Sequence, residues 1–333
     1  MRIGVVGAGA IGGWIGISLA ARGQHELSVL ARGATLAALR AGPWKLISGG
    51  KVLEAEAKVS DVAGELGEQD LVIIALKGPS LESAASAIAP LIGKNTIVVP
   101  AMNGLPWWFL LGGGGELSST RLDSVDPTGS IAAAIPFASV LGSVVHASAS
   151  VSKAGMVTHR AGNRIILGEP NGSRTARVDA VAEVFRSGGF EIEVGDRIQR
   201  DIWYKLWGNM TMNPISAMTG ATCDRILDDP LVNDFVLRVM REAAAVGARI
   251  GCGIDERGED RNKVTRQLGA FKTSMLQDVE AGRSLEIDHL LSAPNEIAGK
   301  LSIETPNMKA LLGLTRLFAR NHGLYPQAHG APE

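Results

Sequence analysis

Cysteine is scarce in this sequence. The 333 residues include two, Cys223 and Cys252, and contain no Cys-x-x-Cys motif. Two cysteines cannot form a disulfide framework, so we expect reduced thiols and a cytoplasmic location. The six histidines are scattered without paired spacing, and the sequence therefore predicts no metal site.

Neither sign of charge is in excess. The chain has 33 lysines and arginines against 34 aspartates and glutamates, for a formal net charge of −1, with no basic block and no acidic tail. Surfaces that bind nucleic acids or anionic membranes depend on concentrated positive charge. We therefore expect neither a nucleic acid nor a membrane as a partner.

The sequence also lacks an uninterrupted apolar run of the ~20 residues that a membrane-spanning helix needs. The apolar stretch over residues 130–151 is broken by Pro136 and His146. The apolar N-terminus is rich in glycine, and charged residues follow soon after it at Arg22 and Glu26. Both features argue against a signal peptide.

Short apolar runs and helix-like segments alternate through the first part of the chain. The strand-like runs lie at residues 3–6, 27–30, 71–76 and 96–99. This alternation predicts an α/β fold with a Rossmann-type, doubly wound parallel sheet. Residues 44–59 contain two further strand-like runs around Ser48-Gly49-Gly50, which predicts a hairpin inserted in that sheet.

Helical patterns dominate the second part of the chain. They lie at about residues 198–220, 230–250, 257–281, 286–301 and 306–322. A length of 333 residues favours two domains, because single cores stop growing at roughly 250–300 residues. We therefore predict a Rossmann domain over 1–195 and an all-α domain over 196–325.

A GxGxxG motif lies between the first strand and the first helix. Its residues are Gly7, Ala8, Gly9, Ala10, Ile11 and Gly12. Gly7 permits a tight turn, Gly9 lets the backbone approach a pyrophosphate, and Gly12 lets helix and strand pack closely. The motif predicts a dinucleotide whose phosphates lie at the helix N-terminus. The alternative is a glycine-rich turn without a ligand.

The end of the second strand indicates which dinucleotide is bound. A site for NAD usually has an acidic residue there, about 20 residues after the glycines, to bind the ribose 2′-hydroxyl. This chain has no acid at that point and has Arg32 instead. A guanidinium suits the 2′-phosphate of NADPH, so we predict NADPH as cofactor. The alternative is a solvated surface arginine.

Five further segments carry a more specific pattern than the glycines. They are Leu76-Lys77, Met102-Asn103-Gly104, Lys205-Leu-Trp-Gly-Asn209-Met-Thr-Met-Asn213-Pro214, Ser274-Met-Leu-Gln-Asp278 and Glu286-Ile-Asp288. Together with the glycine motif, and in this order over almost the whole chain, they resemble the ketopantoate reductases (2-dehydropantoate 2-reductases). The chain departs from the family pattern at Ser80, where Gln or a similar polar residue is common.

The resemblance implies NADPH-dependent reduction of 2-dehydropantoate to pantoate, a step toward pantothenate and coenzyme A. It implies that Lys205 and Glu286 are catalytic, with the lysine acting as general acid or carbonyl polariser. The substrate site it implies consists of Asn103, Asn209, Asn213 and Ser274. Arg32 and Lys77 would hold the phosphate end of NADPH, and Asn103 would also contact the cofactor.

The residues themselves support a site on one helix. Lys205, Asn209 and Asn213 are spaced by four and share one face of a helix that also carries Trp203 and Trp207. Buried amides and ammonium groups need partners. Those partners are either a ligand or other groups of the protein.

Ketone reduction requires a cationic or proton-donating group at the carbonyl oxygen. Lys205 is suited to this role, because desolvation would lower its pKa toward working pH. Glu286 could accept a hydrogen bond from a substrate hydroxyl or balance the charge of Lys205. Its alternative role is that of an ordinary first-turn acid in the field of a helix dipole. We expect His289 to be structural and Asp288 to be an ordinary acid.

The identity of the 2-oxo acid is left open. The motif at Asn103 is followed by Trp107-Trp108-Phe109 and by Gly112–Gly115, which is longer than short family members would have. The aromatic residues either stack on a ligand, cover a cleft or pack as a cluster. Residues 112–130 predict an exposed, mobile loop. Alternative functions are therefore reduction of another branched or larger 2-oxo acid, or non-catalytic NADPH sensing, and a homodimer is also left open.

Overall fold

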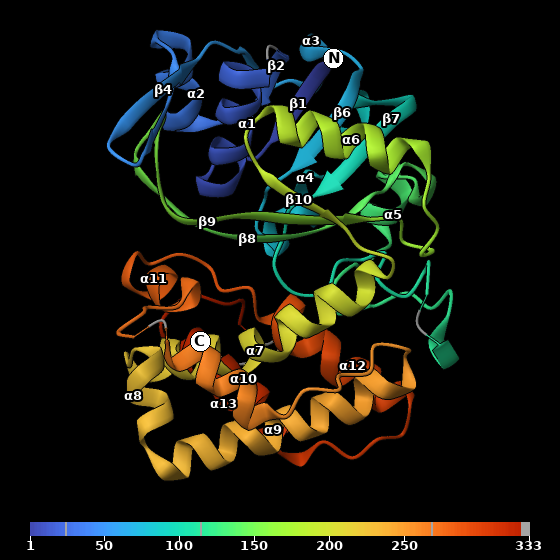
Figure 1. Ribbon diagram of the computed structural model, residues 1–333, viewed down its shortest axis with the longest axis vertical. Helices are drawn as coiled ribbons and strands as arrows, with labels where there is room; N and C mark the ends of the chain where they lie inside the picture. The colour runs from blue at the N-terminus through green and yellow to red at the C-terminus, as the bar shows by residue number, and fades with distance from the viewer. Residues whose placement is uncertain (24, 114, 268, 328–333) are drawn as a thin grey trace. The chain divides into compact units, whose positions relative to one another are not determined.

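The computed structural model describes residues 1–327 except Gln24, Gly114 and Leu268 (Figure 1). The chain forms two compact units. The first unit comprises Met1–Met102 and Thr128–Asp201, and the second comprises Asn103–Pro127 and the chain from Ile202 onward. The predicted domain ranges, 1–195 and 196–325, place residues 103–127 with the first domain, whereas this segment packs in the second unit. Which unit binds which ligand stays a prediction.

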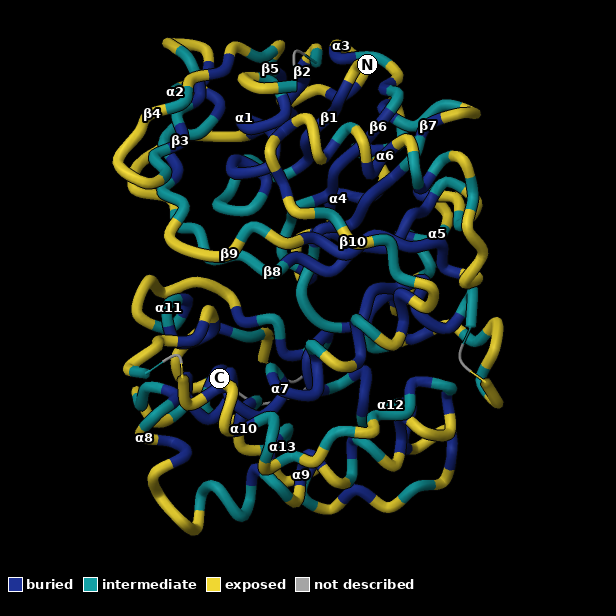
Figure 2. Tube along the Cα trace, in the orientation of Figure 1, coloured by how far each residue is buried: buried dark blue, intermediate teal, exposed yellow. Residues whose placement is uncertain are grey.

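A parallel sheet forms the core of the first unit. Its strands, in spatial order, are β5 (Lys58–Ser60), β2 (Glu26–Leu30), β1 (Arg2–Val6), β6 (Gln69–Ile74) and β7 (Ile92–Pro100). All neighbours pair in parallel. The central strands β1 and β6 are almost continuously buried, as Figure 2 shows. Order and direction confirm the predicted doubly wound sheet.

A second sheet belongs to the same unit. Its strands are β10 (Glu191–Val194), β9 (Met156–Gly168), β3 (Trp44–Ser48) and β4 (Lys51–Ala55), with β8 (Gly142–Lys153) also paired to β9. The predicted hairpin exists as β3 and β4, but its insertion in the parallel sheet is wrong. Strand β3 pairs instead with β9, more than 100 residues later, through partners such as Leu46 and Val157. Local periodicity cannot specify a pairing between such distant segments.

Helix α1 (Ala10–Gly23) lies between the two sheets. A Cβ atom on Gly13 would lie 2.5 Å from Val157 Cγ2 in the second sheet and 2.9 Å from Trp44 Cζ2. On the next turn, a Cβ on Gly16 would lie 3.0 Å from Val5 Cγ2 of the parallel sheet. The helix can therefore approach both sheets only because these positions have no side chain.

Shorter helices complete the first unit. They are α2 (Gly33–Ala41), α3 (Ala63–Leu66), α4 (Gly78–Ile88), α5 (Ser130–Ala134), α6 (Ala176–Ser187) and the 3₁₀ turns η1 (Ala89–Leu91) and η3 (Phe137–Ser139). Helix α6 begins at Thr175, whose hydroxyl accepts a hydrogen bond from the Val178 N–H. Its buried face, which includes Phe185, joins the same core as α1.

The second unit is helical in the part of the chain that the structure describes. Its elements are η2 (Gly115–Leu117), most of α7 (Ile198–Thr219), α8 (Cys223–Asp228), α9 (Pro230–Arg249), α10 (Gly258–Arg266), α11 (Ser274–Glu280), the π-helical turn η4 (Asp288–Ser292), α12 (Ala293–Lys300) and α13 (Pro306–Asn321). The single helix expected over 257–281 is two helices, because Gly269 takes a left-handed φ of 63° and Thr273 caps a new helix. Helix α8 was not predicted.

The segment that follows β7 packs into the second unit. Trp107, Trp108 and Phe109 are all buried, and the Phe109 ring stacks on Trp203 of α7 with centroids 6.1 Å apart. The aromatic residues thus form a packed cluster. The exposed loop predicted for 112–130 is wrong for residues 122–126, which include the buried Leu122 and Asp126, and Gly114 lies outside the described residues.

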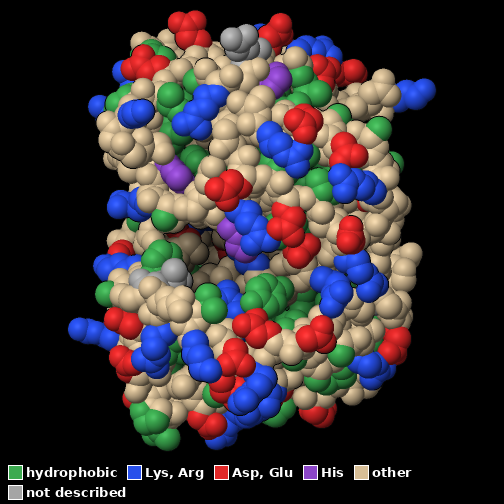
Figure 3. Space-filling view, in the orientation of Figure 1, with side chains coloured by type: hydrophobic (Ala, Val, Ile, Leu, Met, Phe, Trp, Pro, Cys, Tyr) green, Lys and Arg blue, Asp and Glu red, His purple; other side chains and the backbone are tan. Residues whose placement is uncertain are grey.

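Charges of both signs are interspersed over the face shown in Figure 3. No helix among the described residues is both long and apolar enough to span a bilayer. Cys223 and Cys252 are both buried and are not joined in a disulfide.

Candidate functional site

The glycine motif forms the turn between β1 and α1. Gly7 has a φ of 97°, and a Cβ there would lie 2.7 Å from the Ala75 carbonyl oxygen. A Cβ on Gly12 would lie 2.1 Å from the Gly7 carbonyl oxygen. At Gly9, by contrast, a Cβ would meet nothing within 4 Å. Gly7 and Gly12 are therefore required by the fold, whereas Gly9 leaves open space beside the helix N-terminus, where a pyrophosphate group fits.

Two cationic residues lie at the same edge of the parallel sheet. Arg32 follows β2 and Lys77 follows β6, and these strands flank β1. Carboxyl ends of parallel strands meet at one edge, so the structure brings both residues to the edge that carries the glycine turn. Arg32 is exposed, and its guanidinium makes no hydrogen bond or ion pair with any described residue. The edge thus combines free backbone N–H groups with positive charge, as a dinucleotide phosphate requires.

Helix α7 presents Lys205, Asn209 and Asn213 from an otherwise apolar element. Trp203 and Trp207 on the same helix are buried, and the indole N–H of Trp207 donates a hydrogen bond to the Met240 carbonyl oxygen at 2.7 Å. These contacts fix the rotation of the helix about its axis. Lys205 and Asn209 remain partly accessible, whereas Asn213 is only 5% exposed.

The ammonium of Lys205 lies in a polar setting formed by three segments of the second unit. Its Nζ donates a hydrogen bond to Asn103 Oδ1 at 2.9 Å. Burial lowers the pKa of Lys205 to about 8, and the negative charge of Glu286 opposes that shift. The structure therefore brings together Lys205, Asn103 and Glu286, which lie far apart in the sequence.

The asparagine side chains on α7 have hydrogen-bonding capacity to spare. Neither the Asn209 amide nor the Asn213 amide bonds to a described residue. Although Asn213 as a residue is 5% exposed, its amide atoms are not among the fully buried polar atoms without a partner, so they face space that water or a ligand can reach. Internal satisfaction was the alternative to a ligand, and the described residues do not provide it.

Ser274 has no hydrogen bond to the cluster around Lys205 among the described residues. It is exposed at the start of α11, next to Thr273, whose hydroxyl caps the helix. No hydrogen bond of the described chain joins Ser274 to Lys205 or Glu286. Its predicted role in substrate binding stays a prediction.

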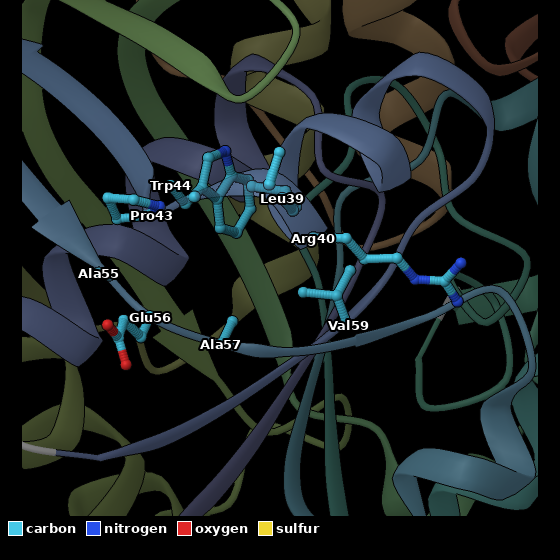
Figure 4. A pocket seen from close by; sticks show the side chains of 10 residues that line it. Leu39, Arg40, Pro43, Trp44, Ala55, Glu56, Ala57 and Val59 are labelled. Carbon is cyan, nitrogen blue, oxygen red and sulfur yellow. The ribbon is translucent and has the colours of Figure 1, made fainter.

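A pocket of about 260 Å³ lies elsewhere in the first unit (Figure 4). It is bounded by the C-terminal end of α2, the start of β3 and the chain before β5. The side chains of Arg40 and Glu56 point away from each other there, so no polar groups converge. None of the predicted site residues lines this pocket.

The sequence did not predict one contact near Lys205, between Gly104 and His289. A Cβ on Gly104 would lie 2.5 Å from the carbonyl oxygen of His289, and the Leu105 N–H donates to that oxygen at 2.9 Å. The left-handed φ of 75° at Gly104 belongs to this close approach. The glycine was part of a recognised motif, but nothing in the sequence pairs it with His289.

No group of three or more His, Cys, Asp or Glu side chains in the described ranges could hold a metal ion. The described residues form a sheet edge suited to an anion in the first unit and a lysine–asparagine–glutamate cluster in the second. The first fits a dinucleotide, and the second fits a polar substrate whose charge changes during reaction.

Comparisons with known proteins identify the family of this chain. The family model for ketopantoate reductase PanE/ApbA matches residues 3–112, and the model for its C-terminal part matches residues 197–319. The 2-dehydropantoate 2-reductase of Mesorhizobium japonicum is 43% identical over 98% of this chain and 100% of its own length.

Solved structures show the same fold. A Ralstonia solanacearum MolK2 protein assigned to the ketopantoate reductases superposes with a TM-score of 0.94 at 53% identity, over 97% of this chain and 99% of its own. The dimeric ketopantoate reductase of Staphylococcus aureus has a TM-score of 0.73 at 19% identity, over 97% of this chain and 100% of its own. The latter likeness concerns the fold alone.

Proposed function

Because the chain belongs to the ketopantoate reductase PanE/ApbA family, we propose that it reduces 2-dehydropantoate to pantoate with NADPH. The observation that carries this proposal is Lys205, a partly buried lysine held by Asn103 with a pKa near 8. The Mesorhizobium japonicum relative bears the name of the same activity.

The cofactor is assigned to the edge of the parallel sheet. The backbone of the motif from Gly7 to Gly12, including Ala8, Ala10 and Ile11, would hold the pyrophosphate, and Arg32 and Lys77 would hold the 2′-phosphate end. Asn103 is assigned to contact both the cofactor and the substrate. NADPH supplies the hydride when it is bound.

The chain's own groups supply the proton and the orientation. Lys205 Nζ donates a hydrogen bond to the ketone oxygen, and as hydride reaches the carbonyl carbon, an ammonium proton passes to that oxygen to give the alcohol. Glu286 favours the protonated lysine and is assigned to the substrate hydroxyl. Asn209, Asn213 and Ser274 are assigned to the substrate carboxylate and hydroxyl, and Asn103 holds the lysine amine in place.

A panel of 2-oxo acids tests the substrate. NADPH oxidation is measured with 2-dehydropantoate and with branched and larger 2-oxo acids that lack its 4-hydroxyl. We expect the highest kcat/KM for 2-dehydropantoate. A best substrate without the 4-hydroxyl would overturn this assignment in favour of another 2-oxo acid. The buried Trp107-Trp108-Phe109 cluster removes the main reason to expect a larger substrate.

The substitution Lys205→Ala separates an enzyme from a non-catalytic NADPH sensor. We expect NADPH binding to persist and turnover to fall at least ~100-fold, the scale of a lost general acid. Lys263→Ala, at an exposed lysine of α10 paired with Asp260, is the matched control and should keep wild-type turnover. Wild-type turnover in Lys205→Ala would refute the mechanism.

Assembly and location complete the proposal. The protein is assigned to the cytoplasm, in keeping with its two buried cysteines, which are not joined in a disulfide. A homodimer is supported by α13, which exposes Leu314 and Leu317 to 58% each, three residues apart on the helix.

A further inference from the structure

His289 is a buried polar side chain that the proposed mechanism does not use. It is 3% exposed, and neither ring nitrogen bonds to a described residue. Burial lowers the pKa of His289 to about 4, against the opposing charge of Asp288. The ring is therefore neutral at physiological pH and has one hydrogen-bond donor and one acceptor.

The residues that hold Lys205 rest directly on this histidine. Gly104 lies so close that a Cβ there would be 2.7 Å from His289 Cβ, and Leu105 N–H donates to the His289 carbonyl oxygen at 2.9 Å. Asn103 directly precedes Gly104, and its Oδ1 accepts the hydrogen bond from Lys205 Nζ at 2.9 Å. A shift of His289 would therefore move the turn at 103–105 and, with it, the partner of the lysine.

The local backbone around His289 is unusual. His289 lies in the π-helical turn η4, three residues after Glu286, which directly precedes this helical stretch. Such turns accommodate an extra residue and are frequent at functional sites. One segment thus carries both the charge that acts on Lys205 and the residue that contacts Gly104 and Leu105, next to Asn103.

The segment does not need the imidazole as an anchor. Asp288 Oδ1 already accepts hydrogen bonds from Ser292 Oγ at 2.8 Å and from the Tyr325 hydroxyl at 2.7 Å. A purely apolar ring of the same size would fill the space occupied by His289 without the cost of burying two polar atoms. The polar ring therefore calls for a role other than packing.

We propose that His289 is a positioning residue, whose neutral imidazole holds the turn at 103–105 through a buried water and so keeps Asn103 against the Lys205 amine. A water bound by several polar groups is the usual partner of such a buried ring. As a statement about catalysis, this proposal rests on the proposed function.

The test compares three variants at one position. His289→Phe keeps the ring volume and removes both nitrogens, whereas His289→Asn and His289→Gln restore a polar atom near Nδ1 or Nε2. For His289→Phe we expect kcat to fall about 10-fold with an unchanged KM for NADPH. The basic limb of the kcat/KM profile should move to lower pH, because Asn103 no longer stabilises the lysine ammonium. One of the two amide variants should restore most of the wild-type kcat and most of the wild-type position of the basic limb.

Thr305→Val is the matched control. Thr305 is a fully buried hydroxyl without a partner among the described residues, just before α13, which carries none of the proposed site residues. We expect it to leave the basic limb of the profile where it is. The proposal is overturned if His289→Phe keeps wild-type kcat and profile, or if its kcat falls while the basic limb stays unmoved. Should His289→Phe fail to fold, the two amide variants are compared with each other. The amide that does not replace the required ring nitrogen should show the lower kcat and the shifted basic limb, and wild-type behaviour of both amide variants would overturn the proposal.

A direct readout separates this proposal from the proposed function. The pKa of Lys205 is measured by NMR of labelled lysine side chains in the free protein, without any substrate. A lower Lys205 pKa in His289→Phe supports the positioning role even if 2-dehydropantoate is not the substrate, and an unchanged pKa refutes it. Absence of wild-type turnover with 2-dehydropantoate would count against the proposed function alone.

Discussion

Two influences set the acidity of Lys205 in opposite directions. Burial disfavours the charged amine and lowers its pKa to about 8, while the carboxylate of Glu286 favours the charged form. The acceptor oxygen of Asn103 at 2.9 Å also matches the protonated amine. At neutral pH the lysine is therefore mostly protonated, yet acidic enough to give up a proton during reduction.

The pH dependence of turnover follows from this balance. Reduction consumes the lysine proton, so kcat/KM for ketone reduction should be level below a pH of about 8 and fall about tenfold per pH unit above it. Oxidation of the alcohol needs the neutral amine and should show the opposite limb. Steady-state profiles in both directions measure this. A reduction rate that rises between pH 8 and 10 would contradict the assignment of Lys205 as acid.

Arg32 determines the choice between the two nicotinamide dinucleotides in our assignment. Arg32→Ala should weaken NADPH binding roughly 10- to 100-fold and NADH binding little, because a charge-assisted bond to phosphate contributes about 1.5–3 kcal/mol. Titration calorimetry with both dinucleotides measures the two Kd values. Arg40→Ala is the control. Arg40 is exposed on α2, the helix that begins directly after Arg32, and its guanidinium pairs with Asp61 at 3.7 Å. Equal losses for both dinucleotides would show that Arg32 does not bind the 2′-phosphate.

At the scale of elements, α1 is the most constrained part of the first unit. It contains the last three residues of the glycine motif, Ala10 to Gly12, and lies against both sheets through Gly13 and Gly16. The glycines in α1 and directly before it thus have two separate purposes. Gly9 leaves room for a ligand, whereas Gly13 leaves room for Val157 and Trp44.

Gly13→Ala should lower the free energy of unfolding by about 1–3 kcal/mol, the usual effect of overpacking. The new Cβ would lie 2.5 Å from a methyl group of the buried Val157. Gly313→Ala in α13 is the control, because a Cβ there meets nothing within 4 Å. The control should gain about 0.5–1 kcal/mol from reduced backbone entropy. Denaturant unfolding measures both, and equal stability of the two variants would contradict the packing argument.

The elements differ in how well the sequence predicts them. Strands β1, β2, β6 and β7 follow continuous apolar runs, and α9 follows helical periodicity with Asp229 as its cap. The second sheet could not be predicted, because β3 finds its partner in β9 far along the chain. Nor could the break between α10 and α11, which depends on the conformation of Gly269 and on the Thr273 cap.

For the molecule as a whole, the predicted fold class, family and enzyme class are confirmed. Reductase chemistry with NADP accompanies that family. The domain ranges and the individual site residues stay predictions. The segment 103–127 is the reason that the two units are discontinuous, since it leaves the first unit after β7 and packs with the second.

The assembly state is testable through α13. We expect sedimentation equilibrium to give twice the chain mass of 34.9 kDa at micromolar concentrations. Leu314→Glu combined with Leu317→Glu should yield monomers, because charges on an apolar contact face oppose association. Val62→Glu, at an exposed valine of the first unit, is the control and should remain dimeric. A monomeric wild-type protein would refute the homodimer.

The parallel sheet, the glycine turn, the absence of an acid after β2 and the polar face of α7 could all be predicted from the sequence. All of these depend on residues close together along the chain, where periodicity, turn chemistry and spacing act directly. The tertiary structure decided which distant residues meet. It placed Asn103 and Glu286 near Lys205, buried the aromatic residues after Asn103 and set His289 beneath Gly104. Such contacts depend on long-range packing, in which burial and close approach are properties of the folded chain and not of any local segment.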